Sequence, residues 1–428
     1  SLNIKAIGVG GSASSISLRG ASSSQVQVNW NGFPVNSVTH GSADLSMIPA
    51  AGFERISVVY GASGALYGSG TFGGAIRLDN DMQTDKALSG GAYLSWQSLK
   101  TLNSGLSFHV GNEKIAWKIS AWGSVSKNEF KYYDYIRQSE RKQTDGPWND
   151  YGMIQNLVIK LSPSSSVESG LWCQAKSLDI PSRIGSTTYE HQSDSTLKIY
   201  LGYKHIRNRW SLKIKTARLA DVQNYRQRAS AQSSVNSIES RIASSQYYGD
   251  VNLRYYLSPG FSVDAGLVGS LITADVSAYG EKKKEKGIAA MAGVKYSFER
   301  LTLQAALRKE WNSSFSSSLL PAFGLAWETI PEKLEIRANY SRKFRRPTFN
   351  DLFWMPGGNS NLNPEKGYTL ETGSEVRLWS DENSQISADA GFYYSHIADM
   401  IVWRPAGAFW EAQNYNNVTS YGVEAKFE

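Results

Sequence analysis

Three glycines with the spacing G-x-G-x-x-G, Gly68, Gly70 and Gly73, could hold a dinucleotide. In that chemistry the glycines form a tight turn after a strand, and the N-terminus of the following helix binds the pyrophosphate. A strand-like segment, "RISVVYG" at 55–61, does precede the glycines. The segment after them, "GAIRLDN" at 74–80, alternates like a strand and is too short for the required helix. We therefore interpret these glycines as tight turns and predict no nucleotide site.

Other residue types that carry chemistry do not form a recognisable site. The sequence has neither the G-x-S-x-G pattern of a nucleophile elbow nor the H-E-x-x-H pattern of a zinc protease. Asp145 and Asp150 could bind calcium in a loop, but the spaced series of oxygen ligands is incomplete. The histidines and the single cysteine are dispersed at His40, His109, His191, His205, His396 and Cys173. We predict no catalytic residues, no metal site and no cofactor, and we classify the chain as a non-enzyme.

The sequence predicts that most of the chain, and with it the histidines and the cysteine named above, lies on or between β-strands. From about residue 88 onward, apolar and polar residues alternate in one segment after another. In "TLKIYLGYK", Leu197, Ile199 and Leu201 alternate with Thr196 and Lys198. A period of two indicates strands with one apolar face and one polar face. About sixteen such segments, each of roughly 9–14 residues, fill the rest of the chain.

The connections between these segments differ in length on the two sides. Short joints at 207–209, 258–260, 298–300 and 330–333 alternate with long polar stretches at 128–150, 178–195, 220–240 and 343–367. Aromatic residues cluster near segment ends, as in "YLSW" and "WKISAW". This pattern is typical of an up-and-down barrel in an outer membrane, where an open sheet edge would leave backbone groups without partners. We therefore predict an all-β transmembrane barrel.

Other classes fit the sequence less well. A soluble propeller would have shorter strands and a repeat of roughly 40–50 residues, and we find neither. The formal net charge of +7 is scattered along the chain, which argues against nucleic-acid binding. No apolar run reaches about 18 residues, so we predict no transmembrane helix. Ahead of the barrel, residues 1–80 are short β-like pieces joined by glycine and serine, and we predict that they form a separate compact domain.

Three motifs, in this order, resemble the TonB-dependent outer-membrane receptors. The first is "ISLRGASSSQVQVNWNGFPV" at 16–35, and the second is "IPAAGFERISVVYGASGALYGSGTFGGAIRLDN" at 48–80. The third is "SRKFRRPTFNDLFW" at 341–354, followed by "GGNSNLNPEKGYTLETG" at 357–373. The resemblance covers the whole chain. Asn31, Ser57, Tyr60 and Ala62 depart from the residues usual in the family, which puts charge contacts at those positions in doubt.

The resemblance implies a barrel of about 22 strands with a plug inside it. Residues 1–84 are then an N-terminal α+β plug domain and residues 85–428 the barrel. About sixteen strands are too few for that ring, so we expect the chain to be truncated at both ends. The family implies active uptake across the outer membrane of a Gram-negative bacterium, energised by the TonB–ExbB–ExbD complex. Outer-membrane lipid and a surface lipoprotein are further candidate partners.

The ligand is indicated by "GSADLS" at 41–46, which closely resembles the plug of vitamin B12 receptors. "FWMPGGNSNLNPEKG" at 353–367 is similar to receptors of the Bacteroidetes type. We expect cobalamin or another corrinoid; a ferric siderophore or haem is the alternative, and a barrel enzyme is a weaker one. By resemblance, the small residues that contact the ligand are Gly11, Ser12, Ala13, Ser14, Asn36, Ser37, Val38, Thr39 and His40. Tyr132, Tyr133 and Trp148 are candidate aromatic contacts from the loops.

A cluster of charges is the last prediction that the resemblance implies. Family receptors pair two plug arginines with two barrel glutamates, here Arg19 and Arg55 with Glu371 and Glu424. An arginine in a largely enclosed interior needs a carboxylate, because an unpaired buried charge costs several kcal/mol. The alternative is that Arg55 pairs locally with Glu54. We further expect the side of the plug that faces the barrel to be polar and hydrated, because the plug must move during transport.

Overall fold

A single curved antiparallel sheet of 16 strands forms most of the structure, a computed structural model. It describes residues 2–6, 11–61, 63–80, 82, 84, 87–135, 137–144, 146–182, 186–380, 384–415 and 417–427. The strands are β7 (Ala87–Gln97), β8 (Thr101–Gly111), β9 (Ile115–Ser126), β12 (Trp148–Ser162), β13 (Ser165–Ile180), β14 (Tyr189–Arg207), β15 (Trp210–Arg228), β16 (Asn236–Ser258), β17 (Phe261–Val276), β18 (Lys283–Phe298), β19 (Leu301–Asn312), β20 (Leu320–Ile330), β21 (Leu334–Arg345), β22 (Glu365–Ser380), β23 (Gln385–Ala398) and β26 (Val418–Phe427). Within the described residues, β7 and β26 are the two edges and the barrel is not closed.

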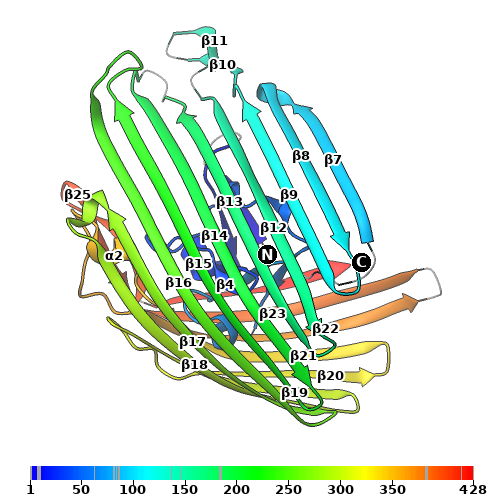
Figure 1. Cartoon of the computed structure of the whole chain (residues 1–428). Helices are drawn as coiled ribbons and strands as arrows, with labels where there is room; N and C mark the ends of the chain where they lie inside the picture. Colours follow the sequence, from blue (N-terminus) through cyan, green and yellow to red (C-terminus); the bar gives the residue numbers. More distant parts are fainter. Residues whose placement is uncertain are drawn as a thin grey trace.

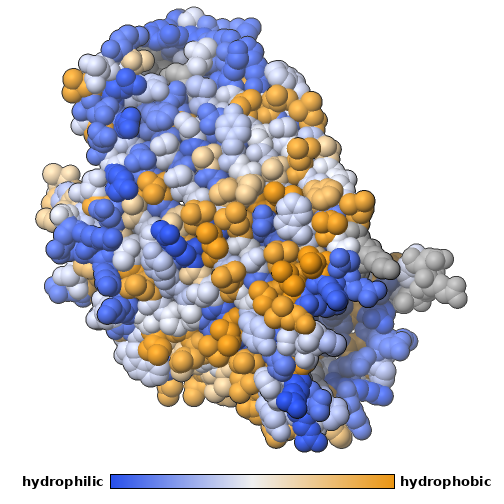
Figure 2. Space-filling model, in the orientation of Figure 1, coloured by the Kyte–Doolittle hydropathy of each residue, from blue (hydrophilic) through white to orange (hydrophobic). Residues whose placement is uncertain are grey.

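The outer face of the sheet is apolar and the inner face is polar. Along β14, Leu197, Ile199 and Leu201 are 39%, 39% and 54% exposed, whereas Thr196 and Lys198, on the other face of the strand, are buried. A soluble sheet would place these residues the other way round. Figure 2 shows hydrophobic side chains gathered across the outer face of the strands, with hydrophilic ones towards the end that carries β10 and β11. The all-β transmembrane barrel predicted from the alternation is confirmed.

Half of the strands in the sheet, β12 to β18 and β22, are longer than the predicted length of roughly 9–14 residues. β16 has 23 residues, and β13 to β16 run through most of the stretches at 178–195 and 220–240 that we expected to be loops. The expectation of loops there was wrong because the alternation of apolar residues stops at a polar stretch, whereas the backbone hydrogen bonds between the strands continue. Beyond the apolar band, both faces of a barrel wall contact water, so paired strands there have no apolar pattern to show.

The N-terminal segments lie inside the curve of the sheet, as Figure 1 shows for the dark-blue part of the chain. Their elements are β1 (Leu2–Ala6), β2 (Ser14–Leu18), η1 (Ser23–Gln25), β3 (Val26–Trp30), β4 (Phe33–Pro34), η2 (Leu45–Met47), η3 (Ala50–Gly52), β5 (Arg55–Val59), α1 (Ser63–Tyr67) and β6 (Gly74–Asp79). β1 pairs with β2, and a second sheet has the order β4-β3-β6-β5. The boundary between residues 84 and 85 stays a prediction, because residues 81, 83, 85 and 86 are outside the described part.

The glycine-rich segment is a turn between a helix and a strand. α1 ends at Tyr67, and Gly68 and Gly70 follow with φ of +81° and +79°, a region that favours glycine. β6 begins at Gly74, so a strand stands where a dinucleotide site needs a helix. The interpretation of these glycines as tight turns is confirmed.

The connections at one end of the barrel carry their own small elements. These are η4 (Ser98–Lys100), β10 (Phe130–Asp134), β11 (Ser139–Gln143), η5 (Ser277–Tyr279), α2 (Phe349–Phe353), β24 (Met400–Ala406) and β25 (Phe409–Tyr415). β10 pairs with β11 and β24 with β25, as separate hairpins. In the part of the chain that the structure describes, no helix is long and apolar enough to cross a membrane.

Candidate functional site

The first predicted contact segment, Gly11 to Ser14, is held in place by Asp44. The Ser14 amide donates to Asp44 Oδ1 at 2.9 Å, and the same oxygen accepts from the Ser46 amide at 2.9 Å. Asp44 is the N-cap of η2 and belongs to the "GSADLS" stretch. Ala13 is exposed, and Gly11 and Ser12 are half-buried. The structure therefore gives "GSADLS" a positioning role beside the predicted contact segment.

The Trp148 indole covers Gly11. Gly11 has φ of +82°, and a Cβ added there would lie 2.6 Å from Trp148 Cγ. Tyr132 and Tyr133 lie elsewhere, on the β10–β11 hairpin that projects beyond the strand ends (Figure 1). Of the three aromatic candidates, the structure thus brings Trp148 to the plug.

Replacing Gly11 with alanine is expected to displace the Trp148 ring. The alanine would adopt an unfavourable backbone conformation, which costs about 1–2 kcal/mol. Its Cβ would also overlap with the Trp148 indole. Tryptophan fluorescence and the free energy of unfolding of the whole receptor would measure the change. In a Trp148→Ala background the steric part should vanish, leaving only the backbone cost. If the cost of Gly11→Ala is the same in both backgrounds, the predicted contact does not exist.

The second predicted segment, Asn36 to His40, is bound more tightly than the sequence suggests. Asn36 Oδ1 accepts from the Val28 amide at 2.7 Å, while Asn36 Nδ2 donates to the carbonyl oxygens of Val26 and Gly41 at 2.9 and 2.8 Å. Its side-chain amide is therefore occupied by the plug backbone. Ser37 Oγ and Thr39 Oγ1 are 2.8 Å apart and bond to each other.

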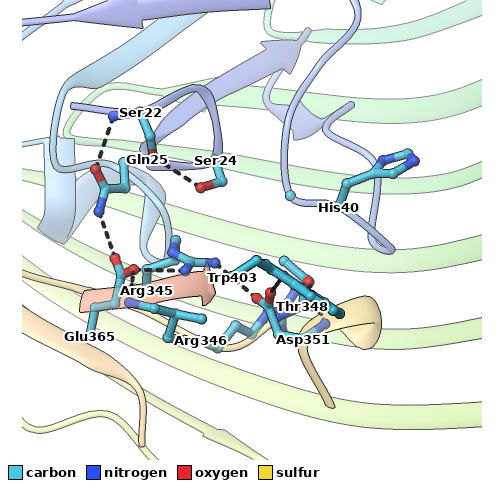
Figure 3. A network of polar contacts seen from close by, with 12 residues as sticks. Ser22, Ser24, Gln25, His40, Arg345, Arg346, Thr348, Asp351, Glu365 and Trp403 are labelled. Carbon is cyan, nitrogen blue, oxygen red and sulfur yellow. Dashed lines mark hydrogen bonds and ion pairs between the residues drawn. The ribbon is translucent and has the colours of Figure 1, made fainter. Parts of the chain in front are cut away.

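The α2 segment lies over the middle of this second segment. The Phe349 amide donates to the Val38 carbonyl at 3.2 Å, and the Asn350 amide donates to the Thr39 carbonyl at 3.0 Å. Thr39 is 1% exposed. His40 is exposed and, in Figure 3, points away from the arginines below it. Of the five residues of this segment, His40 has the most accessible side chain.

Arg19 joins the plug to two barrel glutamates. Its Nη1 lies 3.0 Å from Glu371 Oε1 on β22, and its Nη2 lies 2.7 Å from Glu424 Oε2 on β26. The Gly61 amide also donates to Glu371 Oε1, at 2.9 Å. The guanidinium carbon of Arg19 lies 3.7 Å from the centre of the Tyr60 ring. Burial raises the pKa of Tyr60. The charge of Arg19 lowers this pKa and the charge of Glu371 raises it, and because burial is the largest effect the phenol is neutral.

The structure does not bring Arg55 into this cluster. Arg55 Nη2 lies 3.6 Å from Asp79 Oδ2, and the Arg55 side chain is 53% exposed. Arg55 on β5 stands opposite Asp79 on β6 in the antiparallel register, which places the two side chains together. Glu54, the alternative local partner, instead forms an ion pair with Lys118 on β9. The predicted four-residue cluster is therefore corrected to three residues, with Arg19 between Glu371 and Glu424.

A second, more buried network was missed by the sequence reasoning (Figure 3). Arg345 at the end of β21 donates to Glu365 Oε1 at 2.7 Å and to Asp351 Oδ2 at 3.3 Å. Gln25 Nε2 of the plug donates to Glu365 Oε2 at 2.8 Å. Trp403 Nε1 donates to Asp351 Oδ1 at 3.0 Å. The motifs "FRRPT" and "NPEKG" contain Arg345 and Glu365, but only the register of β21 with β22 shows that they face each other.

The opposite side of the plug is attached to the barrel by aromatic rings. Trp30 is fully buried, with its ring centre 5.8 Å from that of Trp172 on β13 and 5.2 Å from that of Tyr200 on β14. Phe53 lies edge-on to Trp172 at 5.6 Å. The expectation of a polar, hydrated plug surface is wrong on this side. The side is apolar because side chains alternate along β3, which places Val26, Val28 and Trp30 on one face of that strand.

The described residues can also be compared with the geometry that a metal ion needs. Among them, no three histidine, cysteine, aspartate or glutamate side chains lie where they could hold a metal ion. Asp145 lies outside the described residues. Asp150 belongs to β12, where its carboxylate accepts hydrogen bonds from Gln174 Nε2 at 2.9 Å and Trp122 Nε1 at 3.3 Å.

Two family models match the chain. The model "TonB dependent receptor-like, beta-barrel" matches residues 116–428, and "TonB-dependent Receptor Plug Domain" matches residues 1–75. Two proteins named "Vitamin B12 transporter BtuB" are similar in sequence. The one from Vibrio vulnificus is 26% identical over 97% of this chain, and the one from Photobacterium profundum is 24% identical over 97%. The chain spans 66% of the length of each of these two relatives.

Solved structures share the fold at low identity. The copper transporter OprC superposes with a TM-score of 0.77 at 14% identity, with 99% of this chain and 74% of that chain covered. The Serratia marcescens hemophore receptor HasR gives 0.76 at 14% identity, covering 97% and 73% of the two chains. The ferric enterobactin receptor PfeA of Pseudomonas aeruginosa gives 0.74 at 14% identity, covering 97% and 71%.

Proposed function

Because the chain belongs to the family of TonB-dependent receptors, we propose that the whole protein takes up cobalamin, or another corrinoid, across the outer membrane. The observation that carries this proposal is the similarity to two vitamin B12 transporters over 97% of the chain. The "GSADLS" stretch supports it, because its Asp44 holds the predicted contact segment at Ser14. The matched family models describe a receptor barrel and its plug, and not an enzyme.

The attachment of the plug supports active rather than passive uptake. Aromatic rings join it to β13 and β14, and charged side chains of β21, β22 and β26 join it to the rest of the barrel. These contacts hold the plug inside the curve of the sheet, and opening them to let a ligand pass would require work on the plug. We propose that the TonB–ExbB–ExbD complex supplies this work and that the protein lies in the outer membrane of a Gram-negative bacterium. A surface lipoprotein partner and a Bacteroidetes origin stay predictions, since the relatives above come from Vibrio and Photobacterium.

The ligand is tested by titrating the complete purified receptor. We expect cyanocobalamin to bind with a dissociation constant at the nanomolar level, or about −12 kcal/mol, by isothermal titration calorimetry. Ferric enterobactin and haem, titrated in the same buffer, serve as competing ligands. Binding of either of these at nanomolar level, together with no binding of micromolar cyanocobalamin, would replace the corrinoid proposal with an iron-chelate receptor.

A further inference from the structure

A cavity lies beside the plug, between it and the barrel wall. It is bounded by plug strand β3, by barrel strands β16 to β19 and by the segment 345–349. Four of its lining residues, Ser24, Arg345, Arg346 and Thr348, are drawn in Figure 3. Its volume is about 200 Å³. At ~10–15 Å³ for each water site, this is room for on the order of a dozen waters, or for one side arm of a larger ligand.

Three side-chain amides that line this cavity have a buried atom without a partner among the described residues. These atoms are Gln27 Oε1, Asn29 Nδ2 and Gln246 Nε2. Asn29 and Gln246 are 2% and 1% exposed. The Tyr248 hydroxyl donates to Gln246 Oε1 at 2.7 Å, which turns Gln246 Nε2 into the free end of that amide. Buried polar atoms are nearly always hydrogen-bonded, so three unpaired ones around one cavity indicate that something polar binds there.

The charged residues that line the cavity disfavour an anionic occupant. The carboxylates of the cavity belong to Glu285, Glu310 and Asp250, and Asp250 accepts a hydrogen bond from Asn252 Nδ2. The three arginines of the cavity are already paired, Arg308 with Glu310, Arg345 with Glu365 and Arg346 with Glu285, each at 2.7 Å. A carboxylate or an anionic chelate would therefore meet no unpaired arginine among the described lining residues. A primary carboxamide carries one carbonyl acceptor and two N–H donors. These groups complement the two free donors, on Asn29 and Gln246, and the free acceptor on Gln27.

We propose that this cavity is an internal binding site for a neutral carboxamide group. Asn36, Ser37 and Val38 of the second predicted contact segment also line it, so the cavity begins directly beneath that segment. A ligand that leaves the contact segments on its way through the barrel would meet it next. That the carboxamide belongs to the rim of a corrinoid rests on the proposed function. The site itself can be tested with a small amide and without a corrinoid.

The direct test uses crystals of the complete receptor soaked in propionamide or in propionate. We expect propionamide density in the cavity, with its carbonyl within about 3.2 Å of Gln246 Nε2 and Asn29 Nδ2, and none for propionate. In Gln246→Leu crystals the propionamide density should be lost. Ordered water alone in every soak, equal occupancy by both compounds, or unchanged occupancy in Gln246→Leu would each overturn the proposal.

Uptake gives a second readout in energised cells that carry the complete receptor. Gln246→Leu is expected to lower uptake of labelled cyanocobalamin by about tenfold, the cost of one lost hydrogen bond to a buried group. Asn156→Leu is the matched control, because Asn156 on β12 is also buried with an unpartnered atom but does not line the cavity. It should leave uptake unchanged, and equal loss in both variants would overturn the role in transit. If wild type binds no cyanocobalamin but propionamide occupies the cavity, only the corrinoid assignment fails.

Discussion

Replacing Glu365 with alanine is expected to loosen the plug and the α2 segment together, at a cost of about 3–5 kcal/mol. Glu365 is 0% exposed and accepts hydrogen bonds from Arg345 Nη2, from Gln25 Nε2 and from the Ile401 amide at 2.9 Å. Its removal leaves three buried donors without this acceptor, one of them charged. Hydrogen exchange of the complete receptor should show faster opening of residues 22–25 and 349–353, by roughly 10²- to 10⁴-fold.

An exposed ion pair provides the control for Glu365→Ala. Arg254 Nε lies 2.6 Å from Asp264 Oδ1, and the Arg254 side chain is 51% exposed. Because water screens this pair, Asp264→Ala should cost no more than about 1 kcal/mol. Similar exchange rates at residues 22–25 in the two variants would show that the Arg345 network does not hold the plug.

Replacing Trp30 with alanine is expected to detach the opposite side of the plug. Truncating a buried tryptophan costs about 3–5 kcal/mol, and here the cavity would lie between the plug and the rings of Trp172 and Tyr200. Amides of β3 and β6 should exchange faster, while those of the barrel strands should be unchanged. The measurement is hydrogen exchange of the complete receptor, without ligand.

The matched control for Trp30→Ala is Trp410→Ala. Trp410 lies on the β24–β25 hairpin and is 59% exposed, so its truncation should leave plug exchange at the wild-type rate. If Trp30→Ala does not change the exchange of β3 either, the aromatic contact does not stabilise the docked plug. Comparison with Glu365→Ala would also show which side of the plug opens more easily.

The barrel, the class of receptor and the residues that Arg19 contacts could be predicted from the sequence. Alternation in segments such as 196–204 is a local property, because a strand repeats every two residues whatever its neighbours are. The turn at Gly68 and Gly70 could also be predicted locally, because glycine adopts a positive φ without the steric cost that other residues have. The pairing of Arg19 with Glu371 and Glu424 could be anticipated only through the family motifs.

Strand length, the partner of Arg55 and the contacts around the plug could be seen only in the folded chain. Arg55 meets Asp79 because β5 and β6 align there, and Arg345 meets Glu365 because β21 and β22 do. Trp30 lies against Trp172 although 142 positions separate them in the sequence (172 − 30). Such contacts depend on register and on how the plug is rotated within the barrel. A slip of two residues in register, or a rotation of the plug, would keep the facing of every side chain and exchange every partner, so a local pattern of polarity encodes neither quantity.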